Sequence, residues 1–339
     1  MVFDNEKINI GGISMKKYVK HIVVALICFL LILVLNFVLP RALSGDPIAY
    51  LTGFEEEEMS AEKYEYYYHA LHLDESILVQ FEYYLLSIFD GTLGYSYQQQ
   101  ATVSALILEK LGYSLQITIP ATLISIIIGL FWGLNSGYKK ESLSDKISTS
   151  TMVIINALPG FAIALILAIT LGVQLKWFPY VGLSSNWIQV GTWQYLVDRI
   201  YHLILPITAV VLASLPSKYL LVRNTVAKFV DDKSVTYAKQ RGFGNGKIKR
   251  DYVLKNVAQP FVTMVGSSIG SCVGGAIVVE SVFSIKGIGG LLNQAVYTLD
   301  YPLMQGILLV TTLSIVVCVT LSDIVCILID PKVRKGEEV

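Results

Sequence analysis

Long apolar stretches separated by short polar segments occupy most of this 339-residue chain. Six stretches of roughly twenty residues or more lie at about 21–40, 115–134, 147–171, 202–221, 261–283 and 303–329. About twenty helical residues suffice to cross a hydrocarbon core of about 30 Å. The pattern therefore predicts an all-α membrane protein with six transmembrane helices. The composition agrees, because only 15% of the residues are charged, compared with about 25% in soluble domains.

The charged residues between these stretches predict the orientation of the chain. Basic residues follow the second and the last stretch, and four more lie in residues 1–20 (Lys139, Lys140, Lys146, Lys332, Arg334, Lys335; Lys7, Lys16, Lys17, Lys20). Basic residues beside membrane spans favour the cytoplasmic side. We therefore expect residues 1–20 and the tail 336–339 in the cytoplasm, with a core at 113–335. A cleavable signal peptide is the alternative for 21–40, but its apolar region usually has only about 7–15 residues.

The same orientation places residues 41–112 outside the cytoplasm, as a large insert between the first and second transmembrane helices. Glu55–Glu58 are expected to form a solvated acidic loop. Apolar residues recur with helical spacing from Ile77 to Ile88, which predicts a surface helix packed on the protein or in the headgroup layer. His69 and His72 are close in sequence, but a closed metal site needs about four ligands, so no metal is expected.

Several residues interrupt the apolar stretches. Pro159-Gly160 predicts a kink in the third helix, because proline removes a backbone hydrogen bond. Glu280 and Asp323 are acids within or beside apolar stretches, and ionisable residues at membrane depth are costly and by default functional. For Pro159, Glu280 and Asp323, the sequence leaves open a place in a translocation pathway or in internal packing. Gly266, Gly270 and Gly274 would allow close approach of another helix.

The longest polar segment between apolar stretches, residues 222–260, is basic. Its nine lysines and arginines oppose three aspartates (Arg223, Lys228, Lys233, Lys239, Arg241, Lys247, Lys249, Arg250, Lys255; Asp231, Asp232, Asp251). Gly242–Gly246 contains three glycines and predicts a turn between two short helices. Two interpretations fit this pattern. The segment docks into a partner protein, or it lies on anionic lipid.

No motif for chemistry accompanies this segment. Gly244-Asn-Gly-Lys247-Ile248 lacks the upstream glycine and the Ser or Thr of a phosphate-binding loop. The sequence contains no paired catalytic carboxylates and no motif of a metalloprotease or serine hydrolase. Basic and acidic residues balance at 26 each, so no nucleic-acid partner is expected. Any energy for transport must therefore come from another chain.

The basic segment resembles the cytoplasmic motif of ABC-importer permeases, named for its Glu-Ala-Ala-x3-Gly pattern. Ala238 and Gly242 match it, and the interval to Pro260 has the length found in the dipeptide, oligopeptide and nickel permease group. Eight further blocks occur in the order of that group: Ser44–Pro47, Asp90–Ser96, Leu158–Phe161, Leu205–Pro206, Gly275–Phe283, Gly287–Gly290, Asp300–Pro302 and Ile329–Arg334. Departures are Thr236 and Tyr237 in the motif, Lys286 for a common proline, and Leu299 for a common arginine.

The resemblance implies a type I ABC-importer permease fold in the plasma membrane. It implies a second, homologous permease subunit, two cytoplasmic ABC ATPase subunits that bind ATP and Mg, and an extracytoplasmic solute-binding lipoprotein. The chain itself would hold no cofactor and no catalytic residue. Carried over from the motif, Ala238 and Gly242, with the neighbouring Tyr237, Lys239, Arg241, Phe243 and Gly244, would form the contact with the ATPase.

The expected function is to form, with the second permease, the translocation pathway for di- or oligopeptides delivered by the binding protein. A nickel or metal-chelate importer of the same group is the nearest alternative. A secondary transporter belongs to a different class, and internal inverted repeats are common there. No internal repeat is visible in this sequence.

Overall fold

The computed structural model describes residues 15–42, 48, 60–185 and 187–329, so the predicted acidic loop at Glu55–Glu58 lies outside the described residues. Helices dominate, with one two-stranded hairpin. In chain order the elements are α1 Met15–Ala42, α3 Ala61–Ala70, α4 Ile77–Phe89, β1 Tyr95–Ser96, β2 Ala101–Thr102, α5 Val103–Tyr138, α6 Leu143–Ala157, α7 Gly160–Leu167, the π-helix η2 Ala168–Gln174, α8 Trp193–Phe229, α9 Lys233–Gln240, α10 Asn245–Ile248, the π-helix η3 Lys249–Val253, α11 Leu254–Ser271, the 3-10 turn η4 Cys272–Gly274, α12 Ile277–Val282, α13 Ile288–Tyr297 and α14 Tyr301–Ile329.

Four helical stretches in the described part of the chain are long and apolar enough to cross a membrane. They are Val103–Tyr138, Trp193–Phe229, Asn245–Val282 and Tyr301–Cys326. The pair α6 and α7–η2 is a fifth candidate if its two arms count as one span. Helix α1 has 28 residues, a length of about 42 Å at the rise of an α-helix. The described apolar part of α1 runs from Leu26 to Val38.

Two of these stretches are broken more strongly than the sequence suggests. The arms of α6 and α7 meet at 97°, where a kink was predicted, and Pro159 is the exposed N-cap of α7. The predicted continuous helix over 261–283 is also interrupted, because α11 ends at Ser271 and α12 starts at Ile277. Gly275 between them has φ of 72°, a conformation that glycine adopts at little cost.

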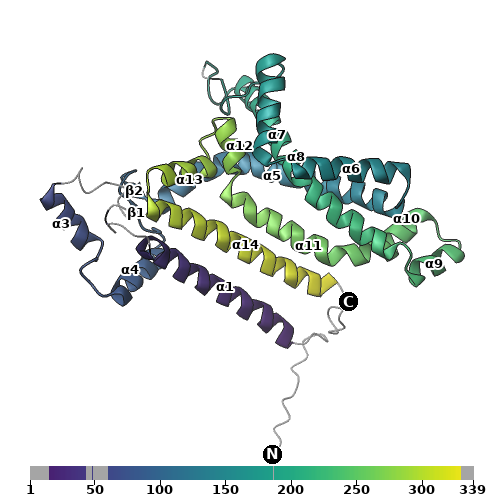
Figure 1. Cartoon of the computed structure of the whole chain (residues 1–339), viewed down its shortest axis with the longest axis horizontal. Coiled ribbons are helices and arrows are strands. Elements are labelled where there is room, and N and C mark those ends of the chain that lie inside the picture. Colours follow the sequence, from purple (N-terminus) through teal and green to yellow (C-terminus); the bar gives the residue numbers. More distant parts are fainter. Residues whose placement is uncertain (1–14, 43–47, 49–59, 186, 330–339) are drawn as a thin grey trace, which may run out of the picture.

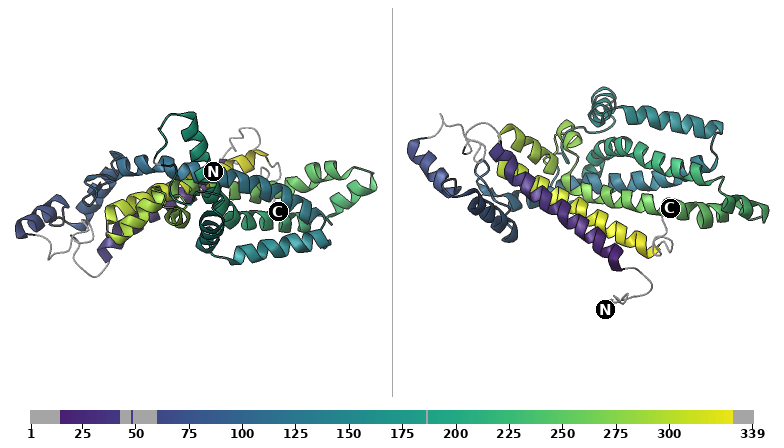
Figure 2. Two further views of the ribbon diagram at one scale, coloured as in Figure 1. Left: turned by 90° about the horizontal axis from the view of Figure 1, so that it is seen from above. Right: turned by 60° about the horizontal axis from the view of Figure 1, so that its bottom comes forward.

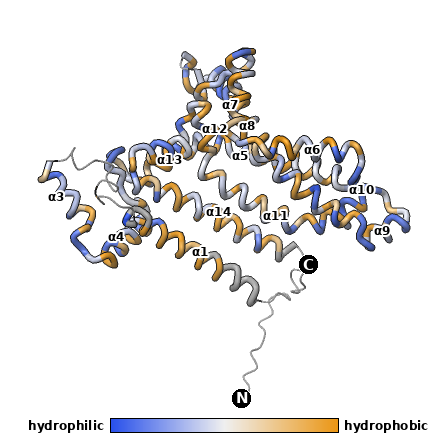
Figure 3. The backbone as a smooth tube through the Cα atoms, viewed as in Figure 1, coloured by the Kyte–Doolittle hydropathy of each residue, from blue (hydrophilic) through white to orange (hydrophobic). Residues whose placement is uncertain are grey.

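The helices form an elongated assembly with different structures at its two ends (Figure 1). Helices α1, α14 and α11 lie side by side, and α5 packs along α8 (Figures 1 and 2). Helices α3 and α4 lie at one end and α9 and α10 at the other. The start of α1 and the end of α14 point away from α3 and α4. Hydrophobic residues follow α1 and α14, whereas hydrophilic residues gather around α9 and α10 (Figure 3).

Glycines make two of the helix contacts unusually close. At Gly129, Gly133 and Gly137 of α5, an added Cβ would lie 2.8, 2.8 and 2.5 Å from an atom of α8. At Gly266 and Gly270 of α11 and at Gly274 of η4, it would lie within 2.6 Å of an atom of α14. The predicted close approach at the second set is confirmed. Small residues let backbones meet where lipid removes the hydrophobic drive between helices.

The surface helix predicted from Ile77 to Ile88 is confirmed as α4. Its Phe81 and Tyr84 rings lie 5.0 and 5.7 Å from the ring of Phe37 in α1. Helix α4 thus packs against the protein through α1, which is one of the two surroundings predicted for it. Leu78 and Phe89 on its other side remain 77% and 85% exposed.

The hairpin β1–β2 is joined to the start of α14 by a buried acid. Ser96 of β1 donates a hydrogen bond to Asp300, whose other carboxylate oxygen accepts from the Leu303 N–H at 3.2 Å. Asp300 is 1% exposed, and this burial raises the pKa of its carboxyl group above the usual value although both hydrogen bonds act to lower it.

Candidate functional sites

The basic segment folds into a short helix, α9, with a closed cap at each end. Asp232 accepts hydrogen bonds from the Ser234 N–H at 2.8 Å and from its hydroxyl at 2.6 Å. At the other end Gly242 has φ of 76°. Its N–H donates to the Lys239 carbonyl at 3.0 Å, and the Phe243 N–H donates to the Ala238 carbonyl at 3.2 Å. This pair of bonds is a Schellman motif, so the predicted glycine turn ends α9.

One face of α9 is buried against its own chain. Val235 and Ala238 are 0% and 1% exposed. They belong to an apolar cluster, here called the α9 seat, with Val222, Val226, Ile248, Val253 and Val257. The sequence placed Ala238 among the residues that contact the ATPase. The structure turns it inward, so its contribution to any such contact is to let α9 lie close to α8, η3 and α11.

The opposite face of α9 and the following turn are exposed and basic. Tyr237 is 62% exposed, and Lys239, Arg241, Gly242 and Gly244 are also exposed. The Arg241 guanidinium lies 5.3 Å from the centre of the half-buried Phe243 ring and 5.8 Å from that of Tyr237. These residues, predicted from the motif, therefore form one surface, here called the α9 surface.

The turn that follows α9 is tied to the end of α5. The Tyr138 hydroxyl donates to the Asn245 side-chain oxygen at 2.9 Å, and the Lys249 ammonium donates to that of Asn135 at 2.6 Å. Burial, together with the charge of nearby Lys139, lowers the pKa of Lys249. The α9 surface is thus attached to α5 as well as to α8 and α11.

A buried ion pair joins α6 to α8. Asp145 of α6 is 1% exposed. Its carboxylate accepts from Arg223 Nε at 2.9 Å and Nη2 at 2.5 Å, and from the Ser136 hydroxyl at 2.7 Å. The two parallel bonds from Arg223 give this carboxylate a bidentate, charge-assisted pair inside the bundle. The sequence analysis missed this pair, since no local spacing links residues 145 and 223.

Glu280 lies at the corner between α12 and α13 with 0% exposure. Its carboxylate accepts hydrogen bonds from the Ser114 hydroxyl at 2.8 Å, the Ala276 N–H at 3.0 Å and the Gly290 N–H at 3.2 Å. A Cβ at Gly287 would come within 2.5 Å of this carboxylate. Glu280 therefore connects α5 to α12 and α13, and a role in a pathway remains a prediction.

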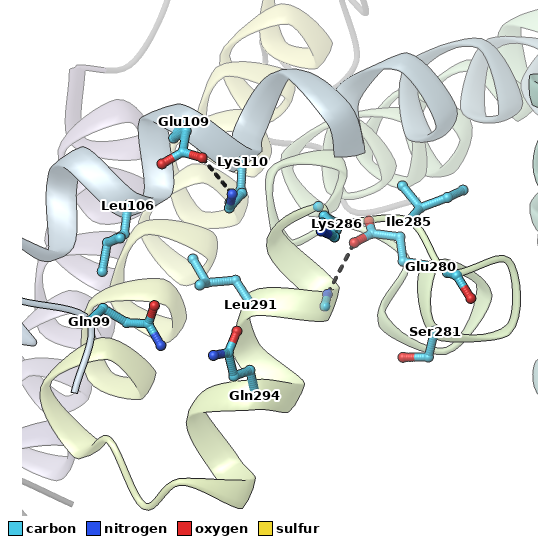
Figure 4. A pocket seen from close by; sticks show the side chains of 13 residues that line it. Gln99, Leu106, Glu109, Lys110, Glu280, Ser281, Ile285, Lys286, Leu291 and Gln294 are labelled. Atoms are coloured by element: carbon cyan, nitrogen blue, oxygen red, sulfur yellow. Dashed lines mark hydrogen bonds and ion pairs between the residues drawn. The ribbon is translucent and has the colours of Figure 1, made fainter. Parts of the chain in front are cut away.

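A cavity of about 510 Å³ borders this corner. Figure 4 shows Gln99, Glu109, Lys110 and Gln294 around it, and Lys286 at the same rim as Glu280. The Lys110 ammonium donates to Glu109 at 2.5 Å. The cavity thus has charged and amide side chains among its lining residues, on the side of the molecule that carries α12 and α13.

The other two pathway candidates have different surroundings. Asp323 of α14 accepts from the Thr263 hydroxyl of α11 at 3.4 Å, whereas Pro159 is exposed at the corner of α6 and α7. Within the described residues no hydrogen bond links Pro159, Glu280 and Asp323 into one site. His69 and His72 also diverge, because His69 Nδ1 lies 2.9 Å from Asp74 and His72 stacks on Tyr83.

Comparison with known proteins agrees with these features. Residues 92–335 match the family described as binding-protein-dependent transport system inner membrane component. The chain is 28% identical over 303 residues to the oligopeptide transport system permease protein AppB of Bacillus subtilis, covering 89% of this chain and 94% of AppB. It is 32% identical over 329 residues to a putative peptide permease of Brucella ovis, covering 94% and 99% of the two chains.

A third relative is the glutathione transport system permease protein GsiC of Escherichia coli, 30% identical over 304 residues, with coverage of 89% and 93%. The family match covers more than half of the chain. The chain therefore belongs to the family of inner membrane components of binding-protein-dependent transport systems. It is a multi-pass membrane protein and a permease subunit of an ABC transport system.

Proposed function

We propose that this subunit carries peptides across the plasma membrane in an ATP-driven importer. Relatives named as oligopeptide and peptide permeases match almost the whole chain, which supports peptides over nickel chelates. The partners would be a homologous second permease, two cytoplasmic ATPases that bind ATP and Mg, and an extracytoplasmic binding lipoprotein. Membrane lipid would surround the exposed apolar residues of α1 and α14.

The proposed topology has six spans, formed by α1, α5, the bent pair α6 and α7–η2, α8, α11–α12, and α14. Both termini and the α9 surface would face the cytoplasm, and residues 41–112 would face the other side. Three features support this arrangement. The start of α1 and the end of α14 point away from α3 and α4, basic residues gather around α9, and basic loops favour the cytoplasm.

The observation that carries the proposal is the two-sided construction of α9. Its exposed face presents Tyr237 and Arg241 to a partner, while its buried face packs into the α9 seat. Close-packed interiors transmit displacement with little compression. ATPase closure against the exposed face would therefore move α8 and α11 through the seat, and α5 through Tyr138 and Asn245. A cavity between the two permeases would then open to the opposite side.

The test is ATP-dependent uptake by the complete importer reconstituted in vesicles with its binding protein. Tyr237→Ala combined with Arg241→Glu changes only exposed side chains of the α9 surface. We expect loss of ATPase co-purification and of peptide uptake. Lys146→Glu is the matched control, because Lys146 is exposed on α6 and outside the α9 surface. Normal coupling in the double variant would refute the role of α9.

The substrate is tested separately with the same vesicles. Uptake of short peptides with ATP, and none without it, is expected. Uptake of nickel chelate in place of peptide would assign the other substrate of the group. Peptide uptake driven by an ion gradient without ATP would show a secondary transporter.

A further inference from the structure

Lys218 is a lysine buried inside the helix bundle. It lies in α8 within the apolar stretch 202–221 and is 4% exposed. Its ammonium donates one long hydrogen bond, to the Ser214 carbonyl at 3.4 Å. Among the described residues no carboxylate forms an ion pair with it, whereas Arg223 one turn further along α8 has Asp145. A charge taken out of water without an opposite charge is strongly unfavourable, so the burial of Lys218 lowers the stability of the bundle unless another group binds it.

The side chain of Lys218 points toward the interior of the predicted span. The Cβ of Lys218 lies opposite Gly129 of α5, where an added Cβ would be 2.8 Å away. The Lys218 side chain extends one turn back along α8 toward Ser214. On α5 the same direction leads from Gly129 toward Ser125 and Thr122. Ser125 is at the centre of the stretch 115–134. The ammonium therefore points along α8 away from the nearer end of the stretch 202–221, whereas lysines that reach the headgroup layer point toward the helix end.

The groups around this ammonium are polar but neutral. The Ser214 hydroxyl is buried and has no hydrogen-bond partner. The Cys272 thiol in η4 lies close enough to interact electrostatically with Lys218. The same thiol forms a hydrogen bond with the Thr122 hydroxyl at 3.3 Å. Two acids on neighbouring elements have partners of their own. Glu280 of α12 accepts from Ser114, Ala276 and Gly290, and Asp323 of α14 accepts from Thr263. Among the described residues, the site thus holds the Lys218 amino group, a hydroxyl without a hydrogen-bond partner and no carboxylate paired with Lys218.

A groove lies beside this site. It encloses about 600 Å³ between α8 and α11. Five of its eight lining residues carry a hydroxyl or an amide, and two of the eight, Ser217 and Leu221, flank Lys218 along α8 (Ser217, Leu221, Gln259, Pro260, Thr263, Met264, Ser267, Ser268). These hydroxyl and amide groups offer hydrogen bonds to water or to a polar solute, whereas the rest of the lining is apolar.

We propose that Lys218 binds the carboxylate of the transported peptide when α8 and α11 separate during transport. This inference rests on the proposed peptide import. A carboxylate of the protein itself would compete with the peptide carboxylate for Lys218. A site that binds the peptide transiently therefore requires a lysine without a counter-ion, as in the described part of the bundle. The Ser214 hydroxyl supplies a second donor. Binding must also be weak enough for release, which one lysine and one hydroxyl satisfy better than a bidentate arginine.

The experiment compares two peptides in the reconstituted importer. Tetra-alanine with a free carboxylate and its C-terminal amide are each supplied at concentrations that saturate the binding protein, established by direct titration. The variants are Lys218→Met, which keeps the length of the stem without the charge, and Lys218→Arg, which keeps the charge. Lys146→Met is the control for loss of one exposed lysine.

Wild-type protein is expected to carry the free acid faster than the amide. Lys218→Met should lower uptake of the acid about tenfold, a change of about 1.4 kcal/mol, and leave uptake of the amide within about twofold. Lys218→Arg should keep the preference for the acid. An equal fall for both peptides, with loss of the second permease on purification, would show that Lys218 pairs with that subunit and would overturn the proposal.

An unchanged preference in Lys218→Met would overturn it as well, since the charge would then play no part in transport. If wild-type protein carries neither peptide with ATP, the proposed substrate is wrong and this inference falls with it. The two failures are therefore distinguishable by the wild-type measurement alone.

Discussion

The contact between α5 and α8 gives the sharpest test of the fold. In Gly133→Ala, the new Cβ would lie 2.8 Å from the Tyr219 carbonyl oxygen, 2.9 Å from Val222 Cβ and 3.1 Å from the Arg223 nitrogen. Two of these three atoms belong to the backbone of α8 and cannot turn away. To reach an ordinary contact of 3.4 Å, the helices must separate locally by about 0.6 Å.

The magnitude follows from two opposing effects. Overpacking of a tight contact typically costs about 1–3 kcal/mol. Alanine in place of glycine within a helix gains up to about 1 kcal/mol. Gly133→Ala should therefore destabilise the protein by about 1–2 kcal/mol. Gly112→Ala in the same helix is the matched control, because Gly112 is exposed and an added Cβ there meets nothing within 4 Å.

The assay is thermal unfolding of both variants in detergent, followed by the amount of monodisperse protein on size exclusion. Gly112→Ala should unfold at the wild-type temperature or slightly above it, and Gly133→Ala several degrees below. Because α8 leads into α9, peptide uptake should also fall in Gly133→Ala. Equal or higher stability of Gly133→Ala would show that the glycine face of α5 does not meet α8 as described.

Three further predictions concern single residues. Asp145→Asn leaves Arg223 without its buried partner and should cost about 3 kcal/mol. Thermal unfolding in detergent should show this deficit, and unchanged stability of the variant would contradict the assignment. Asp300→Asn should change the pH dependence of stability. Because burial raises the pKa of this carboxyl group, wild-type stability should fall as the pH rises above about 4, and the variant should lose that dependence. Gly242→Ala places a side chain at φ of 76° in open space and should cost about 1–2 kcal/mol from backbone strain alone, seen as faster hydrogen exchange in α9, whereas Gly244→Ala with φ of −65° should exchange at the wild-type rate.

The helical membrane character and the α9 segment follow from local properties of the chain. The length of an apolar stretch decides whether a helix can cross a bilayer, and that length can be counted directly along the sequence. The turn at Gly242 is local as well, because only the conformation of that residue and its two hydrogen bonds define it. The glycine spacing at 266, 270 and 274 predicted a close contact, and Gly129, Gly133 and Gly137 of α5 show the same spacing in the sequence and the same close contact in the structure.

The tertiary structure alone decided which residues meet. Asp145 and Arg223 pair across 78 positions, and Ala238 turns inward because Val235 and Ile248 form its seat. The 97° corner at Pro159 and the break at Gly275 depend on packing, since proline and glycine permit a bend without setting its angle. Lys218 is an ordinary lysine in the sequence, and only the approach of α5 and η4 buries it without an acid. Local composition determines where helices form and partition, whereas the register and distance between them depend on shape complementarity over residues far apart in the chain.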